Sequence, residues 1–337
     1  MKHEIDLSKY KTRTDLAIEL IENNIDIKTK EYDNIKVSKI ILDEKKKKKI
    51  NKKKGNYITI EFTDVTDEQN KENVKQIFKK ELKELLHTIN IKEEDKCLII
   101  GLGNRKSTPD SLGPKTIEKL IITNHLYELG VLEQKYRRVC AITPGVMGET
   151  GIETSDIIKS IVKKTNPNFV IVIDALASSS IERVNKTIQI TDTGIYPGSG
   201  IGNNRKEISK EILNIPVIAI GVPTTVDAVT IVSDTINFIT KYYTYTRKNI
   251  NNPINKLIVN NEINYLKKDI KLNTQEKKEL LGLVGNLTEE ETRQLIKETL
   301  TPIGYNFMVT PKEVDFIIEK LSDILGNGLN ETLHKIN

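Results

Sequence analysis

Four runs of apolar residues, many of them β-branched, each end in a loop drawn from Gly, Pro, Ser, Thr and Asp, and this pattern constrains the fold most strongly. The runs cover residues 97–100, 139–142, 169–173 and 216–220. Such runs are typical of strands buried on both faces of a parallel sheet. Amphipathic helices are predicted between them, the clearest over 153–164. Strands that alternate with helices predict an α/β fold with a mainly parallel central sheet.

Two strands and an insertion are predicted outside this pattern. Residues 35–42 and 57–62 are rich in β-branched side chains and predict strands on either side of a lysine-rich loop at 43–56. Residues 247–300 are rich in Asn, Lys and Glu, with weaker apolar patterning. We therefore expect this stretch to be a peripheral, partly helical insertion.

Further helices follow from apolar spacing and from capping signals. The apolar positions over 70–89 repeat with helical spacing, and a helix is also predicted over 114–130. Near the end of the sequence, Thr310 and Pro311 are an N-cap and a first-turn proline. They predict the start of a last helix, which Gly326 should end.

Composition makes several classes of protein improbable. The 337 residues include 52 basic and 47 acidic side chains, a net charge of +5, and much of the excess lies at 45–49 and 52–54. This clustering predicts a solvated loop, so we expect no direct binding to nucleic acid. No apolar run is long enough to span a bilayer, and the N-terminus lacks an apolar signal region. We therefore expect a cytoplasmic protein without a membrane partner.

Several common catalytic motifs are absent or incomplete. Gly101 and Gly103 begin a dinucleotide-like motif, but Lys106 occupies the position of its third glycine. The four histidines lie outside the four loops, so a Ser/His or Cys/His site would lack its base. The triplet Asp192–Gly194 matches pepsin-like proteases, but those need two such triplets in an all-β protein. We expect Asp192 to have a structural role.

Carboxylates are the reactive groups that the loops contain. The candidates are Asp110, Glu149, Glu153, Asp174 and Asp227. The carboxyl ends of parallel strands meet at one edge of a sheet, so Asp110 and Asp174 are expected to face each other. Two close carboxyls share a proton, and one then acts as a base on water while the other acts as an acid. The alternative for each aspartate is a helix N-cap or another structural hydrogen bond.

A series of longer motifs, each different from the others, extends along nearly the whole chain. They include Leu7–Tyr10, Arg13–Ala17, Gly101–Asn104, Thr108–Pro114, Pro144–Gly148, Ile173–Ala177, Ser180–Asn185, Pro197–Gly200, Gly221–Thr224 and Met308–Val314. Together they resemble the germination protease family of endospore-forming bacteria. The resemblance leaves out only the lysine-rich loop and residues 247–300.

The resemblance implies an endopeptidase that degrades small acid-soluble spore proteins early in germination. It implies a self-processing zymogen, a homotetramer, a location in the forespore and spore core, and no cofactor. The fold would be three-layer α/β/α, phosphorylase/hydrolase-like and related to hydrogenase-maturation peptidases. The mechanism proposed for the family is an atypical aspartic one, and its aspartates match Asp110 and Asp174 here.

The resemblance also predicts where the chain cleaves itself. Residues 13–19 are similar to the family's cleavage sequence, an acidic residue followed by a large apolar and a small one. Cleavage is expected between Asp15 and Leu16, which makes 1–15 a propeptide and 16–337 a single catalytic domain.

An acidic residue before the cleaved bond calls for a cationic pocket, in which Arg is the better partner. Arg183, Arg205 and Lys206 are candidates for substrate binding, and Glu153 is a further one. The alternative is that the three cations are solvated at the surface.

Two other functions stay open. The first is a metal-dependent endopeptidase that uses the same carboxylates as ligands, although Tyr196 stands where many relatives would be expected to have histidine. The second is a non-catalytic binding protein for acidic or nucleic-acid partners, which the net charge of +5 would favour. We expect no metal ion in the site.

Overall fold

The computed structural model describes residues 14–20, 27–44, 52–198, 205–249, 274–300 and 307–335. The chain divides into two compact units. The sheet unit comprises Arg13–Val226 and Thr310–Asn337, and the helical unit comprises Met1–Thr12 and Asp227–Val309. Most of the predicted propeptide, most of the lysine run and the first part of the predicted insertion lie outside the described residues. The predicted division at residue 15 stays a prediction.

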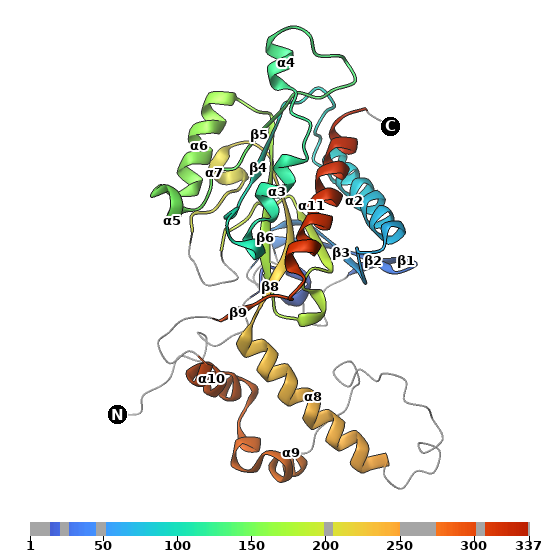
Figure 1. Ribbon diagram of the computed structural model, residues 1–337, viewed down its shortest axis with the longest axis vertical. Coiled ribbons are helices and arrows are strands. Elements are labelled where there is room, and N and C mark those ends of the chain that lie inside the picture. The colour runs from blue at the N-terminus through green and yellow to red at the C-terminus, as the bar shows by residue number, and fades with distance from the viewer. Residues whose placement is uncertain are drawn as a thin grey trace. The chain divides into compact units, whose positions relative to one another are not determined.

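A mixed sheet forms the centre of the sheet unit (Figure 1). Its strands lie in the order β1-β2-β3-β7-β8-β6-β4-β5. Their bounds are β1 (Lys28–Tyr32), β2 (Ile35–Leu42), β3 (Gly55–Phe62), β4 (Cys97–Gly101), β5 (Val139–Ile142), β6 (Phe169–Ser178), β7 (Thr187–Thr191) and β8 (Val217–Asp227). The strands β5, β4, β6 and β8 are parallel, and each pairing from β8 through β7, β3 and β2 to β1 is antiparallel. The four parallel strands contain the four predicted apolar runs, but the predicted loops after residues 173 and 220 are wrong. β6 continues to Ser178 and β8 continues to Asp227, because these residues stay paired with each other across the sheet.

Helices cover both faces of the sheet. On one face lie α2 (Glu68–Thr88), α3 (Leu112–Glu118) and α11 (Val314–Leu333), and on the other lie α6 (Thr154–Thr165) and α7 (Lys210–Leu213). Along β4, Ile99 packs in the first core and Leu98 in the second, because successive strand residues point to opposite faces. The predicted α/β fold with a parallel centre is therefore confirmed, in three layers.

The sheet unit contains several shorter helices as well. They are η2 (Ala17–Leu20), η3 (Thr108–Asp110), α4 (Asn124–Glu128), α5 (Met147–Thr150) and η4 (Ile181–Arg183). The predicted single helix over 114–130 is wrong, because α3 ends at Glu118 and α4 begins at Asn124. Between them, the N–H of Ile121 donates to Asn330 of α11 (2.9 Å) and that of Thr123 donates to Val139 of β5 (3.1 Å). These tertiary hydrogen bonds replace the helical ones.

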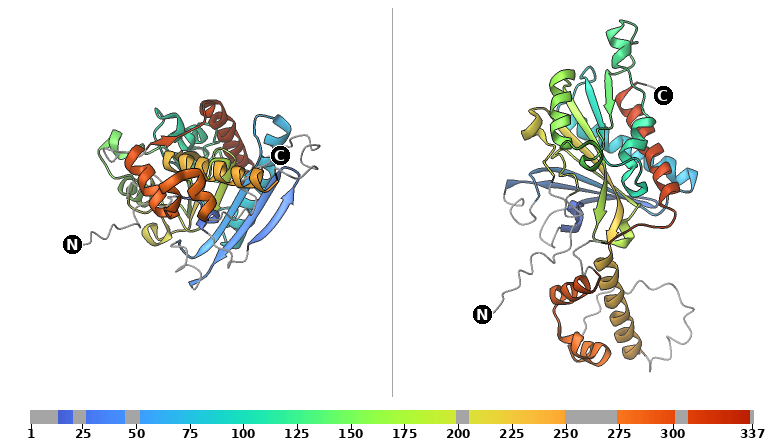
Figure 2. Two further views of the ribbon diagram at one scale, coloured as in Figure 1. Left: turned by 90° about the horizontal axis from the view of Figure 1, so that it is seen from below. Right: turned by 60° about the vertical axis from the view of Figure 1, so that its left-hand side comes forward.

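The last helix differs from its prediction at both ends. It begins at Val314 and runs past Gly326 to Leu333, beside α2 (Figures 1 and 2). A Cβ on Gly326 would lie 2.5 Å from the Cβ of Lys119, so this glycine permits close packing instead of ending the helix. The hydroxyl of Thr310 donates to the carbonyl of Thr224 (2.9 Å) instead of capping the helix.

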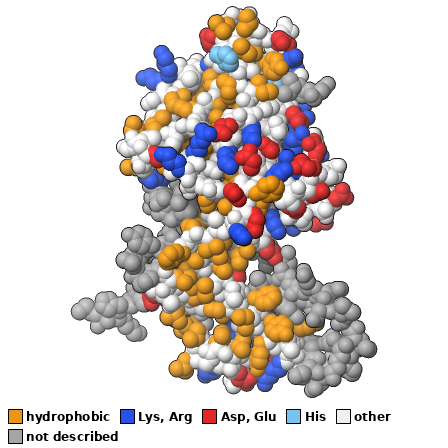
Figure 3. Space-filling view, in the orientation of Figure 1, with side chains coloured by type: hydrophobic (Ala, Val, Ile, Leu, Met, Phe, Trp, Pro, Cys, Tyr) orange, Lys and Arg blue, Asp and Glu red, His pale blue; other side chains and the backbone are white. Residues whose placement is uncertain are grey.

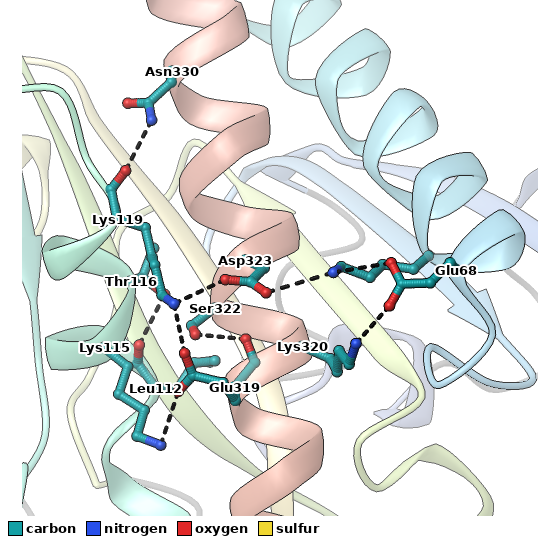
Figure 4. Close-up of polar contacts among 11 residues, drawn as sticks. Glu68, Leu112, Lys115, Thr116, Lys119, Glu319, Lys320, Ser322, Asp323 and Asn330 are labelled. Atoms are coloured by element: carbon teal, nitrogen blue, oxygen red, sulfur yellow. Dashed lines mark hydrogen bonds and ion pairs between the residues drawn. The ribbon is translucent and has the colours of Figure 1, made fainter.

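Ion pairs link α11 to both of its neighbouring helices (Figure 4). Lys119, the residue directly after α3, pairs with Glu319 (2.5 Å) and Asp323 (3.0 Å), and Lys320 pairs with Glu68 of α2 (2.5 Å). Solvent screens these pairs, because their side chains are partly or largely exposed, so they contribute little to stability. Apolar packing, not charge, holds α11 on the sheet.

The helical unit contains α8 (Ala228–Asn249), α9 (Thr274–Leu281), η7 (Gly282–Asn286), α10 (Glu289–Leu300) and the short strand β9 (Met308–Val309). Apolar side chains gather on the face of this unit that Figure 3 shows. Large exposed ones include Ile239, Tyr242, Leu283 and Leu295. Across the described parts of both units, no helix combines the length and apolar character needed to cross a membrane.

Candidate active site

The loop after β4 brings Asp110 to the part of β6 that contains Asp174, so the two predicted catalytic aspartates lie at the same end of β4. Gly101, the last residue of β4, is in register with Ile173 of β6, which directly precedes Asp174. After Gly101 the chain turns back through Gly103, which has a φ of +106°. A Cβ there would lie 2.0 Å from the carbonyl oxygen of Asp110, so only glycine allows this turn. The turn carries Asp110 back over the strand end.

Asp110 is half-buried at the end of η3. The backbone N–H of Asn104 donates to its Oδ2 (2.8 Å). Burial raises the pKa of the Asp110 carboxyl to about 6, the hydrogen bond from Asn104 opposes this, and the charge of Glu149 raises it further. At neutral pH this carboxyl has lost its proton and is a stronger base than an ordinary aspartate.

Asp174 is 5% exposed, and its Oδ1 accepts a hydrogen bond from the N–H of Ala175 (3.0 Å). Burial raises the pKa of this carboxyl well above its ordinary value, and the charges of Asp110 and Asp15 raise it further. The charge of Asp110 therefore acts on Asp174. The sharing of one proton between the two carboxyls stays a prediction.

The segment 14–20 lies along the end of β6. The N–H of Asp15 donates to the carbonyl of Ala177 (3.0 Å), and the N–H of Ala177 donates to the carboxylate of Asp15 (2.9 Å). The next two residues, Leu16 and Ala17, are both 0% exposed. Ala17 packs with Tyr57 and other residues of β2 and β3. The predicted cleavage sequence is therefore held by Ala177 of β6, three residues beyond Asp174.

Glu19 binds the end of the same segment to the loop after β6. Its carboxylate accepts hydrogen bonds from the hydroxyl of Ser178 (2.7 Å) and from the N–H of Ser179 (2.7 Å). Arg183 pairs with Glu19 (3.2 Å) and with Glu61 (3.0 Å). Arg183 thus contacts the bound segment at Glu19, four positions after Asp15, and its predicted role in binding the acidic residue before the cleaved bond stays a prediction.

The other three predicted substrate-binding residues gather at the start of α6. The guanidinium of Arg205 lies 3.9 Å from the carboxylate of Glu153 and 2.8 Å from the sulfur of Met147. The N–H of Lys206 donates to Glu153 (3.3 Å), and its ammonium pairs with Asp156 (2.8 Å). Arg183 and this group of three therefore occupy different environments.

Two further carboxylates have structural partners. Asp192 accepts hydrogen bonds from the N–H (2.7 Å) and the side-chain amide (2.6 Å) of Asn56, in keeping with its expected structural role. Asp227 accepts one from the N–H of Val229 at the start of α8 (2.8 Å). Among the residues that the structure describes, no group of three or more His, Cys, Asp or Glu side chains is placed to hold a metal ion.

Two residues that sequence reasoning did not single out hold the carbonyl oxygen of Asp15. The ammonium of Lys52 donates to it (2.9 Å), and so does the side-chain amide of Gln189 (3.3 Å). The amide oxygen of Gln189 also accepts from the N–H of Ala17 (2.7 Å). Lys52 was expected in a solvated loop, but it is partly buried against the bound segment. No strand was predicted over 187–191, so the burial of Gln189 at the centre of β7 is a finding of the structure.

Comparison with known proteins places these residues in a wider context. The sequence model described as germination protease matches residues 3–337. The germination proteases of Priestia megaterium (strain ATCC 12872 / QMB1551) and Geobacillus sp. (strain WCH70) are 47% and 49% identical to the chain, over 99% of its length. These matches cover 96% and 97% of the two relatives. A crystal structure of the NiFe hydrogenase maturation protease HycI from Thermococcus kodakarensis KOD1 is 19% identical, with a TM-score of 0.27, over 42% of this chain and 80% of that one.

Proposed function

Because the chain belongs to the germination protease family, we propose that it is an endopeptidase that starts the degradation of small acid-soluble spore proteins during germination. The proposal includes a zymogen that processes itself, cleavage after acidic residues and an atypical aspartic mechanism. The observation that carries it is the buried carboxyl of Asp174, whose pKa is raised by burial and by the charge of Asp110.

In this mechanism the two aspartates divide the work of acid and base. The ionised carboxylate of Asp110 takes a proton from water as the water oxygen attacks the peptide carbonyl carbon. The protonated Asp174 supplies the acid. Environments that separate the protonation states of two neighbouring carboxyls are the usual way in which one site provides both functions.

The bound segment 14–20 supports self-processing between Asp15 and Leu16. The acidic side chain of Asp15 is held by a backbone N–H, while Leu16 and Ala17 are buried. The acidic, large and small residues of the predicted cleavage sequence thus each have a matching environment beside Asp174. A bond held in this way reacts without the entropic cost of bringing enzyme and substrate together.

A homotetramer and a location in the cytoplasm of the forespore and in the spore core belong to the same proposal and rest on the family resemblance. The exposed apolar side chains of the helical unit, such as Leu283, support self-association, because exposed patches of this kind mark interaction surfaces.

The test is self-processing of the full-length chain, followed by intact mass and by sequencing of the new N-terminus. We expect Asp110→Asn and Asp174→Asn to stop the reaction while keeping the fold. Asp95→Asn is the matched control, since Asp95 lies before the opposite end of β4. Cleavage at the wild-type rate in either dyad variant would refute the mechanism, and a new N-terminus other than Leu16 would refute the cleavage site.

A further inference from the structure

We propose that Lys52 and Gln189 form the oxyanion site for self-cleavage, in which they stabilise the carbonyl oxygen of Asp15 as it becomes negatively charged. The inference deepens the proposed function and rests on it. Its starting point is that both side chains already donate to the oxygen of the one peptide bond expected to be cut.

The contact of Lys52 has the distance that such a site requires, and that of Gln189 is slightly longer. Effective donors lie about 2.7–3.1 Å from the position of the oxyanion. The Lys52 ammonium is 2.9 Å from the Asp15 oxygen, and the Gln189 amide is 3.3 Å away. Gln189 also accepts a hydrogen bond from the N–H of Ala17 (2.7 Å), so this one side chain contacts the backbone on both sides of Leu16. The carbonyl is therefore held in one orientation.

The register of the sheet places Gln189 opposite Asp174, the proposed acid. Gly221 of β8 is in register with Asp174 of β6 on one side and with Gln189 of β7 on the other. Two strand spacings separate the outer residues by about 10 Å between backbones, which leaves room for one peptide group between their side chains. The bound segment occupies this space, since Asp15 contacts Gln189 and its charge acts on Asp174.

The charge of Lys52 suits the transition state better than the bound substrate. A neutral carbonyl offers the ammonium only a dipole, whereas an oxyanion offers a full charge in a site from which the packed segment excludes water. An interaction that strengthens in this way accelerates the chemical step. Burial lowers the pKa of the Lys52 ammonium, while the carboxylates of Asp15 and Glu19 act in the opposite direction and favour its charged form.

The assignment also fixes the route of the proton held by Asp174. Water attacks the Asp15 carbonyl carbon and gives a proton to Asp110, while the π electron pair moves onto the oxygen held by Lys52 and Gln189. The C–N bond then breaks, its electron pair goes to the Leu16 nitrogen, and that nitrogen takes the proton from Asp174. The oxygen lone pair re-forms the C=O bond of a carboxyl group. That group ionises and returns a proton to Asp174, and Asp110 passes its own proton to the new amine.

The experiment compares first-order rates of self-processing for the full-length chain and its variants. Lys52→Met keeps the aliphatic stem without the charge, and we expect a loss of about 10²–10³-fold, the usual effect of removing one oxyanion donor. Lys52→Arg keeps a donor and should retain more activity than Lys52→Met. Gln189→Leu should be slowed less, because a neutral donor forms the weaker hydrogen bond. The matched control is Lys54→Met, an exposed lysine two residues away, which should process at the wild-type rate.

Thermal denaturation of each variant separates chemistry from folding. A folded Lys52→Met variant that processes at the wild-type rate overturns the inference. If this variant does not fold, Gln189→Leu decides in the same way. A loss of rate in Lys54→Met equal to that in Lys52→Met also overturns it, because a general effect of loop charge would then explain both. Failure of the wild-type chain to cleave itself, or cleavage by Asp110→Asn, instead removes the proposed function beneath it.

Discussion

The parallel and antiparallel halves of the sheet contribute different chemistry to the same site. In the parallel half, β4 ends at Gly101 opposite Ile173, while β6 continues to Ser178, so the loop after β4 brings Asp110 to Asp174 within β6. The antiparallel strands β7 and β3 run in opposite directions. They contribute a buried side chain within a strand, Gln189, and a residue before a strand, Lys52. The parallel half thus holds the two proposed acids, and the antiparallel half holds the proposed hydrogen-bond donors.

The largest expected effect tests whether the parallel half acts as one unit. Asp110→Asn and Asp174→Asn should each lower the self-processing rate by about 10⁴-fold or more, and the double variant should be no slower than the slower single one. The reason is that the reaction needs an ionised Asp110 and a protonated Asp174 at the same time, so the loss of either one removes the function of both. Intact mass over days measures these rates. Losses that multiply in the double variant would mean that the two aspartates act independently.

The next prediction tests how the charge of Asp15, in the bound segment, affects the pKa of Asp174. The charge of Asp15 raises the pKa of Asp174, so Asp15→Asn lowers that pKa and leaves less Asp174 protonated at alkaline pH. We expect the alkaline limb of the rate profile to move to lower pH, with a loss of rate on that limb alone. Asp15→Glu keeps the charge and serves as the control. A uniform loss at every pH would assign Asp15 to binding alone.

A smaller effect concerns stability. The pKa of Asp110 rises from its ordinary 3.8 to about 6 in the folded protein. The folded state therefore binds the proton more tightly than the unfolded state, and the free energy of unfolding falls as pH rises from about 4 to about 6. Asp110→Asn removes this cost and should stabilise the protein by about 1–3 kcal/mol at pH 7, with no gain at pH 4. Urea unfolding at the two pH values measures the difference, and an equal gain at both would assign it to another cause.

The last prediction is that removal of metal ions has no effect on self-processing. Because Asp110, Asp174, Lys52 and Gln189 together would supply base, acid and oxyanion donors, exhaustive chelation should leave the self-processing rate unchanged. Zinc, manganese and calcium added back afterwards form the control. A loss on chelation that one of these ions restores would favour the metal-dependent alternative and would assign the carboxylates of the parallel half to that ion.

The same contrast explains what the sequence predicts well. The parallel strands and the helices α2 and α6 follow from apolar periodicity, which is a local property. The approach of Asp110 to Asp174 follows from the parallel pairing of β4 with β6, although β6 continues past Asp174 instead of ending there. Gly326 was misread because its reason lies in another helix, at Lys119. Local capping rules do not include such packing.

The donors of the antiparallel half could not be predicted, because their role depends on contacts between distant parts of the chain. Lys52 is separated from Asp15 by 37 residues, and Gln189 by 174. Lys52 also stands next to a run of similar lysines, so nothing local distinguishes it. Gln189 stands between two isoleucines in the sequence, and an amide buried among such residues needs hydrogen-bond partners.

The segment 14–20 belongs to the same chain as the strand that binds it, and this has a kinetic consequence. Cleavage there would be first order, so its rate would not change when the protein is diluted. Any other polypeptide would have to compete with a segment of very high effective concentration, and would lose. Cleavage after Asp15 would release residues 1–15, whereas residues 16–20 would stay on the mature chain. Loss of the contacts of Asp15 to Ala177 would then be the single event that both completes maturation and frees the N–H and the carbonyl of Ala177 for substrates arriving from solution.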